Sequence, residues 1–254
     1  AHFPLRGLKV ALESPVHSPL RAGKEALARA LRKVLRAASR QSITDPDTLI
    51  FVQGDLNSRS VLQGGKIRDV LLDVLSDDTL QAAIAHGLPV PPGRWYELVD
   101  SGGAESLPVT YKFTERPGAE FQLPANPGAN GRRTALTLGD LVQSAGSVGR
   151  PPAHHEGEES LSDAYRRTLM DIGTERLHRW GLDFQEHTFR PVHFPASADR
   201  VVYWAPRGLA ARMRWSFPRG GYEVGHTQGG SDHRPVCVDA HLRLAASSSA
   251  ADLH

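Results

Sequence analysis

Apolar residues near the start of the chain recur at the spacing of a helix. Ser18 and Pro19 form an N-cap signal, and apolar side chains then follow every three or four residues as far as about Arg40. The same spacing over residues 67–75 predicts a second helix, and a capping signal over residues 78–87 predicts a third, short one. The first helix is amphipathic with a basic outer face, which we interpret as a solvated face in preference to a nucleic-acid or membrane patch.

Runs of apolar and β-branched residues predict strands between and after these helices. The continuous apolar run at 48–53 has the length of a strand and is typical of one buried on both faces. Residues 95–99 fit either a strand or the end of a helix, and residues 108–113 have strand composition. Further strands are predicted at 8–12, 188–194, 200–204, 209–217 and 236–244.

Glycine and proline mark the irregular parts of the chain. They crowd the region from about 115 to 159, which we expect to be a surface insertion into a domain that spans residues 1–244. Residues 160–180 are predicted to be helical, and residues 245–254 form a low-complexity tail. Helices that alternate with strands, followed by several strands in succession, predict a layered α/β fold.

The composition excludes several classes of protein. Of the 254 residues, 40% are hydrophobic and 23% are charged, which is the profile of a folded globular protein. A formal net charge of +2 is too small for binding by charge alone, although residues 1–60 carry ten basic and five acidic side chains. The single cysteine, Cys237, excludes a disulfide framework and indicates a reducing compartment. The start at Ala1 leads us to expect a processed product or a piece of a longer chain.

Polar residues capable of chemistry follow the predicted strand at 48–53. Asp55 and Asn57 lie two residues apart, so their side chains can point the same way. Such a pair can orient a water, bind a hard cation or hydrogen-bond a phosphate oxygen. The alternative is an Asx-type turn in which both side chains cap their own backbone, and the residues alone leave both interpretations open.

Two later segments place an acid beside a base. Asp232 can hold the imidazole of His233 in one tautomer, which would make His233 a general base for water; an exposed strand start is the alternative. Asp199 can orient a histidine or bond a phosphate-bearing group, and Arg200 can clamp an anion through its fork of donors. A surface salt bridge is the alternative for this second pair.

Four of these segments together resemble the endonuclease/exonuclease/phosphatase superfamily. Gly-Asp-Leu-Asn at 54–57 and Ser-Asp-His at 231–233 are similar to its motifs. Val-Thr-Tyr-Lys-Phe at 109–113 and the segment 195–204 resemble motifs of the inositol polyphosphate 5-phosphatases, and residues 1–5 are a weaker match to a strand end of that family. The resemblance implies an α/β (α+β) fold, a four-layer α/β/β/α sandwich of the DNase I-like type, of which this chain looks like the second half.

The resemblance also implies roles for the matched residues. His233 would be the general base that activates the attacking water, with Asp232 as its orienting partner. The other implied members of the catalytic site would position the water and the phosphoryl group: they are Asp55, Asn57, Asp199 and His2.

The implied activity is magnesium-dependent hydrolysis of the 5-phosphate of phosphoinositides or soluble inositol polyphosphates. Tyr111, Lys112 and Arg200 are expected to bind the other phosphates of the inositol ring, and Mg²⁺ would neutralise the phosphoryl oxygens. The implied partner is therefore the inositol phosphate substrate. We expect a cytoplasmic protein, with peripheral membrane contact where that substrate is a lipid.

The chain departs from the family pattern in two respects. Ser58 and Ser197 stand where the family has Tyr and Trp, which we expect to loosen the packing more than to remove chemistry. The resemblance covers residues 1 to about 244 but only the second half of the family's domain. The metal-ligating Glu is therefore expected outside this chain, and the missing half-domain or a larger assembly is an expected partner.

Two other hypotheses remain open from the sequence. The chain can be a non-catalytic structural or scaffold subunit that keeps a partial phosphatase fold. It can also be a nuclease of the same superfamily that acts on abasic DNA, although Tyr111, Lys112 and the segment 199–204 argue against nucleic acid as a partner.

Overall fold

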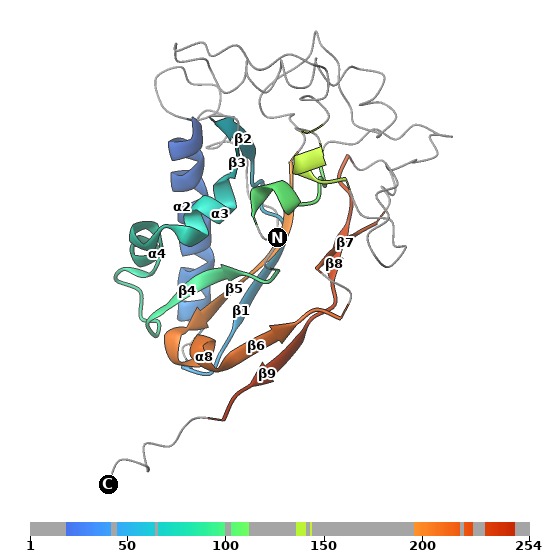
Figure 1. The fold of residues 1–254 in the computed structure, drawn as a ribbon. Helices are drawn as coiled ribbons and strands as arrows, with labels where there is room; N and C mark the ends of the chain where they lie inside the picture. Colours follow the sequence, from blue (N-terminus) through green and yellow to red (C-terminus); the bar gives the residue numbers. More distant parts are fainter. Residues whose placement is uncertain are drawn as a thin grey trace.

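The fold is a mixed α/β arrangement with small antiparallel sheets (Figure 1). The strands predicted at 8–12 and 188–194, the helix predicted at 160–180, most of the insertion and most of the tail lie outside the described residues. The computed structural model describes residues 19–41, 45–63, 66–99, 103–111, 136–140, 143, 196–218, 221–225 and 232–246.

A three-stranded antiparallel sheet forms the centre of the fold. β5 (Asp199–Pro206) is the middle strand and pairs with β1 (Ile50–Asp55) on one side and β4 (Gly93–Glu97) on the other. Side chains alternate along each strand, so neighbouring residues of β5 serve opposite faces of the sheet. The strand predicted at 200–204 is confirmed, and the ambiguous segment at 95–99 begins as a strand.

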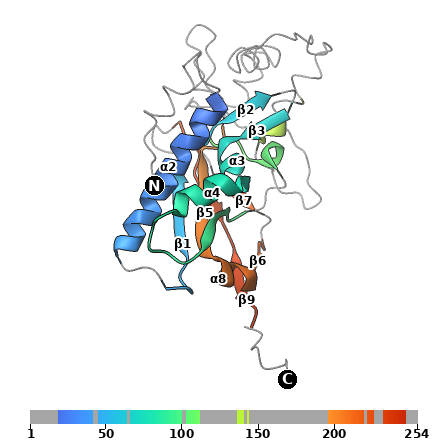
Figure 2. The same cartoon turned by 90° about the vertical axis from the view of Figure 1, so that its left-hand side faces the viewer.

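Three helices lie on one side of this sheet (Figures 1 and 2). They are α2 (Pro19–Arg40), α3 (Val70–Ser76) and α4 (Asp78–Ala85). The main hydrophobic core lies between them and the sheet, because the apolar stripe of each helix and alternate residues of each strand share one cluster. Its largest buried members are Leu31, Leu35, Leu71, Ile84, Trp95 and Trp204.

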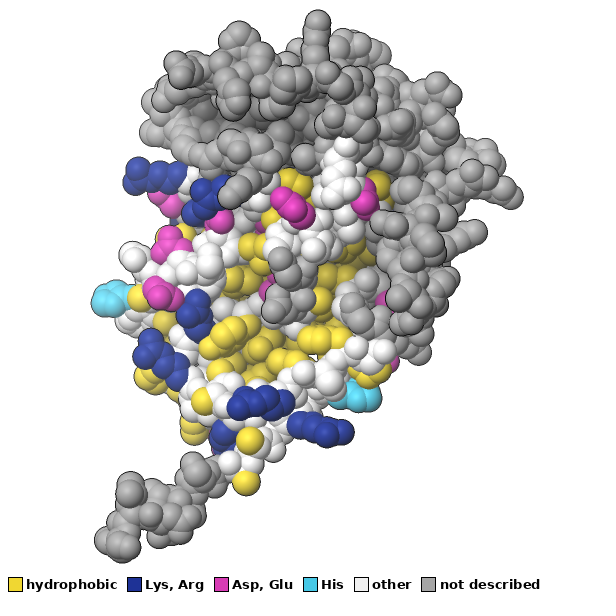
Figure 3. Space-filling view, in the orientation of Figure 1, with side chains coloured by type: hydrophobic (Ala, Val, Ile, Leu, Met, Phe, Trp, Pro, Cys, Tyr) yellow, Lys and Arg dark blue, Asp and Glu magenta, His cyan; other side chains and the backbone are white. Residues whose placement is uncertain are grey.

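The opposite face of the sheet carries a second apolar cluster. α8 (Arg207–Arg212), β6 (Met213–Ser216) and β9 (His241–Leu244) contribute to it, and β6 pairs with β9. Hydrophobic side chains gather between the central sheet and these elements in the face drawn in Figure 3. Phe51 of β1 is 50% exposed on this side. The prediction that the strand at 48–53 is buried on both faces is therefore wrong, because the helices cover only one.

Smaller elements accompany the central sheet. β2 (Ser60–Gln63) pairs with β3 (Lys66–Asp69), and β7 (Tyr222–Val224) pairs with β8 (Val236–Val238). A short 3₁₀ helix, η1, spans Ala104–Ser106. β3 leads directly into α3, which brings the end of the small sheet next to the helical layer.

Three predicted boundaries are wrong, each for a local reason. The strand predicted at 209–217 begins as α8 and only then becomes β6, since its Leu and Ala residues favour a helix. The strand predicted at 236–244 is two strands, β8 and β9, with different partners. The helix predicted from residue 67 begins at Val70, because the Asp69 side chain caps it by accepting from the N–H of Leu72 at 3.0 Å.

Within the described residues, no helix combines the length and the apolar character that crossing a membrane requires.

Candidate active site

The candidate site is built where β1 ends and β5 begins. The two strands run antiparallel, and their register places Asp55 opposite Asp199. The pairing continues one step further, because the N–H of Leu56 donates to the carbonyl oxygen of Ala198 at 2.9 Å. Two carboxylates that are 144 residues apart in sequence (199 − 55) are thereby held at the same end of the sheet.

Thr110 joins this end of the sheet to two further segments. Its buried side-chain oxygen accepts from the N–H groups of Ala198 and Asp199 at 3.0 and 3.1 Å. Its backbone carbonyl accepts from the N–H of Arg234 at 2.8 Å. Tyr111 completes the junction, because it bridges to Ala196 on one side and to His233 on the other. Backbone pairing thus places His233 beside the strand ends that carry Asp55 and Asp199.

Asp199 is the residue that holds the His233 ring. His233 Nδ1 lies 2.8 Å from Asp199 Oδ2, whereas Nε2 lies 3.9 Å from Asp55 Oδ2 and 4.0 Å from Asp232 Oδ1. The expected pairing of His233 with its sequence neighbour Asp232 is therefore not the contact that orients it. A carboxylate only accepts hydrogen bonds, so the neutral imidazole carries its proton on Nδ1 and its basic lone pair on Nε2.

The surroundings raise the pKa of His233 above its ordinary value. Burial alone would lower this pKa, but the hydrogen bond and charge of Asp199 outweigh burial, and the charges of Asp55 and Asp232 add to the effect. Tyr111 packs against the imidazole with ring centroids 4.8 Å apart. The result is a half-buried histidine with higher basicity, a fixed ring and one nitrogen directed toward two further carboxylates.

Asp55 and Asn57 form the Asx-type turn that the sequence left as an alternative. Asp55 Oδ1 accepts from the backbone N–H of Asn57 at 2.8 Å, and Asn57 adopts a left-handed backbone with φ of 51°. Asn tolerates that conformation better than most residues. The other oxygen of Asp55, Oδ2, is the atom nearest His233, so the turn and a role in the site are compatible.

Arg59 is a site residue that the sequence reasoning missed. Its side chain is 3% exposed, its Nη2 donates to Asn57 Oδ1 at 3.2 Å, and its guanidinium carbon lies 4.6 Å from the centroid of the Tyr111 ring. Burial lowers the pKa of Arg59, whereas attraction to Tyr111, Asp55 and Asp232 and a hydrogen bond with Tyr111 act in the opposite direction. The only available signal was its position two residues after Asn57. Arg234, which follows His233 in the sequence, is also buried, and burial lowers its pKa to about 10.

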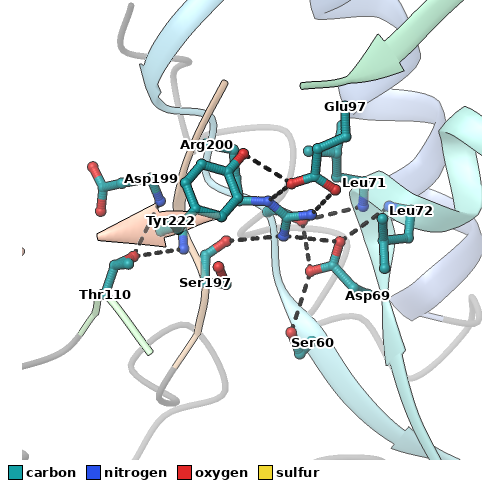
Figure 4. A network of polar contacts seen from close by, with 12 residues as sticks. Ser60, Asp69, Leu71, Leu72, Glu97, Thr110, Ser197, Asp199, Arg200 and Tyr222 are labelled. Carbon is teal, nitrogen blue, oxygen red and sulfur yellow. Dashed lines mark hydrogen bonds and ion pairs between the residues drawn. The ribbon is translucent and has the colours of Figure 1, made fainter. Parts of the chain in front are cut away.

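Arg200 lies in a different place from the one expected. Its side chain is fully buried, with Nε and Nη2 donating to the two carboxylate oxygens of Glu97 at 2.5 and 2.6 Å. Its Nη1 lies 3.4 Å from Asp69 Oδ1. Figure 4 shows the Asp199 carboxylate pointing away from this guanidinium. The expectation that Arg200 binds substrate phosphates is corrected accordingly: the residue is enclosed by two carboxylates on the helical side of the sheet.

The residues around Arg200 are themselves tied into the fold. Burial alone would lower the pKa of Arg200, but the charges of Asp69 and Glu97 outweigh burial and raise it. Asp69 Oδ2 accepts from Ser58 Oγ at 2.9 Å and from Ser60 Oγ at 3.2 Å. Ser58, which we expected to loosen the packing, therefore contributes a hydrogen bond to this network.

Tyr222 closes the network from β7. Its hydroxyl donates to Glu97 Oε1 at 3.0 Å and accepts from the N–H of Val201 at 3.0 Å (Figure 4). Burial, reinforced by the charge of Glu97, raises the pKa of Tyr222. Glu97 and Tyr222 carry no motif in the sequence, so only the folded chain reveals Glu97 as the partner of Arg200 and Tyr222 as a partner of Glu97.

The described residues bring together part of the predicted site. Asp55, Asn57, Tyr111, Asp199, Asp232 and His233 lie at one end of the sheet. His2 and Lys112 lie outside the described residues. The described residues hold no group of three or more His, Cys, Asp or Glu side chains arranged to bind a metal. Asp55 and Asp232 offer the oxygen donors that Mg²⁺ prefers, but they do not by themselves complete a magnesium site.

Comparison of the chain with protein families, with curated proteins and with solved structures found no match.

Proposed function

We propose that this chain is a phosphoric monoester hydrolase that removes the 5-phosphate of phosphoinositides or inositol polyphosphates. The observation that carries the proposal is the fixed His233, with Nδ1 on Asp199 at 2.8 Å and Nε2 directed toward Asp55 and Asp232. A histidine held in one tautomer by a carboxylate is suited to take a proton from water. The resemblance of the motifs to inositol polyphosphate 5-phosphatases supplies the substrate class.

In this proposal His233 Nε2 takes a proton from the water that attacks phosphorus. The new bond joins the water oxygen to phosphorus, the bond from phosphorus to the inositol oxygen breaks, and the inositol oxygen takes up a proton. Asp199 keeps the ring oriented and stabilises the imidazolium that forms. Asp55 lies at 3.9 Å from Nε2, a distance that leaves room for it to orient the water.

Substrate recognition in the proposal rests on fewer residues than the sequence suggested. Tyr111 lies against His233 and keeps its expected role beside the inositol phosphates. Lys112 follows Tyr111 directly in the chain and keeps its expected role as a cationic ligand. Arg200 no longer has such a role, because Glu97 and Asp69 occupy its donors. Magnesium remains part of the proposal on the strength of the resemblance.

We also propose that the described sheet is one half of a DNase I-like sandwich. One face of the sheet is covered by α2, α3 and α4, as the outer helical layer of such a sandwich would require. The opposite face presents the second apolar cluster, including the half-exposed Phe51, to the side where the second sheet would pack.

Phosphate release from inositol phosphates tests the proposed function. The purified full-length protein that contains these 254 residues is incubated with inositol polyphosphates and phosphoinositides that carry or lack a 5-phosphate, in magnesium and in EDTA. We expect release only from substrates with a 5-phosphate, only with magnesium, and a loss of about 10²- to 10⁴-fold in rate for His233→Ala.

His241→Ala is the matched control, because His241 is exposed on β9 and also lies near an acid, 3.8 Å from Asp239. We expect it to keep the wild-type rate. Equal rates for the His233 and His241 variants, or no release from any inositol phosphate, would overturn the proposal. No release from any inositol phosphate would favour the scaffold hypothesis. Faster cleavage of an abasic duplex than of inositol phosphates would favour the nuclease hypothesis.

A further inference from the structure

Arg59 is a buried arginine beside His233 whose donors are only partly used. Its Nη2 donates to Asn57 Oδ1 at 3.2 Å, but its Nε and Nη1 have no hydrogen-bond partner among the described residues. The side chain is 3% exposed, and its guanidinium lies over the Tyr111 ring at 4.6 Å. Buried donors of a charged group are nearly always paired in folded proteins, so the two open donors call for a partner that the described residues do not provide.

Arg200 provides a comparison, because it is a buried arginine whose role is structural. Its Nε and Nη2 are held by Glu97, and its Nη1 lies near Asp69. Arg59 is as deeply buried, yet no carboxylate takes its Nε or Nη1 within the described part of the chain. The two arginines differ in their partners and not in their burial, so the described part of the chain leaves two donors of Arg59 available to a ligand.

The charges around Arg59 identify what that partner would be. Asp55, Asp199 and Asp232 surround His233, so a phosphate dianion that approaches the histidine meets three carboxylates. Arg59 is attracted to two of them, Asp55 and Asp232, and contacts Tyr111, which stacks on the imidazole. A guanidinium at this point offsets their repulsion and offers N–H groups to anionic oxygens.

We propose that Arg59 binds phosphate oxygens of the substrate through Nε and Nη1 while Nη2 stays on Asn57. This inference rests on the proposed function for the identity of the substrate, and it adds a cationic ligand that no motif supplied. It gives the site the positive charge that Arg200 does not provide. Tyr111 then contacts both the phosphate-binding Arg59 and the general base His233, which fixes the anion close to the nitrogen that activates water.

Inorganic phosphate is the probe that tests the proposal, because every candidate substrate contains it. An NMR titration of the isotope-labelled chain in magnesium buffer measures the phosphate affinity of folded molecules alone, since unfolded molecules give separate signals. We expect Arg59→Met to weaken phosphate binding about ten- to a hundredfold, the range for a lost charge-assisted hydrogen bond. Arg243→Met is the matched control, because Arg243 is exposed on β9, and we expect wild-type affinity.

The stability of the same variants separates a ligand-binding role from a structural one. Methionine replaces a buried charge that has two unpaired donors, so we expect Arg59→Met to unfold at the same urea concentration as wild type or at a higher one. Wild-type phosphate affinity in folded Arg59→Met would overturn the proposal. If Arg59→Met does not fold, Arg59→Lys replaces it: weaker phosphate binding in this folded variant supports the proposal, and unchanged binding overturns it.

The outcomes distinguish this proposal from the proposed function. Phosphate binding that depends on Arg59 in a chain that hydrolyses no inositol phosphate would uphold the anion site and overturn the phosphatase. Hydrolysis that depends on His233, with unchanged KM and phosphate affinity in Arg59→Met, would uphold the phosphatase and overturn the role of Arg59. We expect His233→Ala to keep its phosphate affinity within a few fold while losing turnover.

Discussion

Asp199 and Arg200 are neighbours in β5, yet they belong to two charge clusters with opposite properties. The cluster around Arg200 is closed: the guanidinium is fully buried between Glu97 and Asp69. The cluster around Asp199 is open: the His233 side chain is 24% exposed, and three carboxylates approach it. Alternation along the strand directs adjacent charges to these two environments. The closed cluster stabilises the fold, whereas the open one leaves charge that a ligand can match.

The largest effect is expected from opening the closed cluster. Arg200→Met removes the cation and leaves the carboxylates of Glu97 and Asp69 buried without their partner. Breaking a buried ion pair in this way costs about 3–5 kcal/mol. Urea unfolding followed by circular dichroism should therefore show a large drop in the free energy of unfolding, or no cooperative transition.

A partly exposed ion pair provides the control for that variant. Arg68 lies 2.8 Å from Asp73 with its own side chain 42% exposed, and Asp73 keeps Lys24 at 3.2 Å when Arg68 is replaced, so the loss should be about 0–1 kcal/mol. Arg68→Met should therefore unfold close to wild type. If the Arg200 variant is no less stable than the Arg68 variant, the closed cluster does not hold the sheet to α3 as the contacts indicate.

The sequence predicted the open cluster better than the closed one. Gly-Asp-Leu-Asn, the Asp199 segment and Ser-Asp-His each end or begin a predicted strand, and backbone pairing does bring Asp55, Asp199 and His233 together. The expectation that Arg200 faces the candidate site was wrong, although the sequence already contained the information against it. Residues 199 and 200 are adjacent in a strand, so period-2 alternation already forbids both side chains from facing one site.

Other contacts had no signal in the sequence. Glu97 and Tyr222 meet Arg200 only because β4 and β7 approach β5 in three dimensions. The pairing of His233 with Asp199 instead of Asp232 depends on the path of residues 108–111 between two strands. The exposure of Phe51 depends on which face the helices cover, and an apolar run looks the same whether one face is buried or both.

An intermediate effect is expected from changing the charge in the open cluster. Asp199→Asn removes the carboxylate that raises the pKa of His233, so that pKa should fall. If His233 is the general base, the acidic limb of kcat/KM in wild type lies above pH 6.5, the ordinary His value, and moves to lower pH in the variant. We expect a loss of about 10²-fold in rate at the optimum, and a pH profile of phosphate release measures both changes.

The same variant has a stability readout that does not depend on catalysis. A raised pKa in the folded state means that folding favours protonated His233, so this contribution is fully present below about pH 6.5 and is lost as pH rises through the folded pKa. The stability difference between wild type and Asp199→Asn should therefore be larger at pH 5.5 than at pH 8.5. Asp232→Asn is the control, because Asp232 is 4.0 Å from the ring and 45% exposed, and its pH-dependent difference should be smaller.

The smallest effect is expected on the face of the sheet that carries Phe51. Two neighbouring residues of β1 again face opposite environments, one buried and one exposed, but here both side chains are apolar. Val52 is 6% exposed and packs in the main core, whereas Phe51 is 50% exposed against Tyr203 and Trp215. Val52→Ala should cost about 2 kcal/mol, and Phe51→Ala about 1 kcal/mol or less despite removing the larger side chain. Urea unfolding at two protein concentrations measures both. A cost of about 3–5 kcal/mol for Phe51→Ala, the value for a buried Phe, would mean that this face of the sheet is covered in solution. The two faces would then not differ in burial at β1.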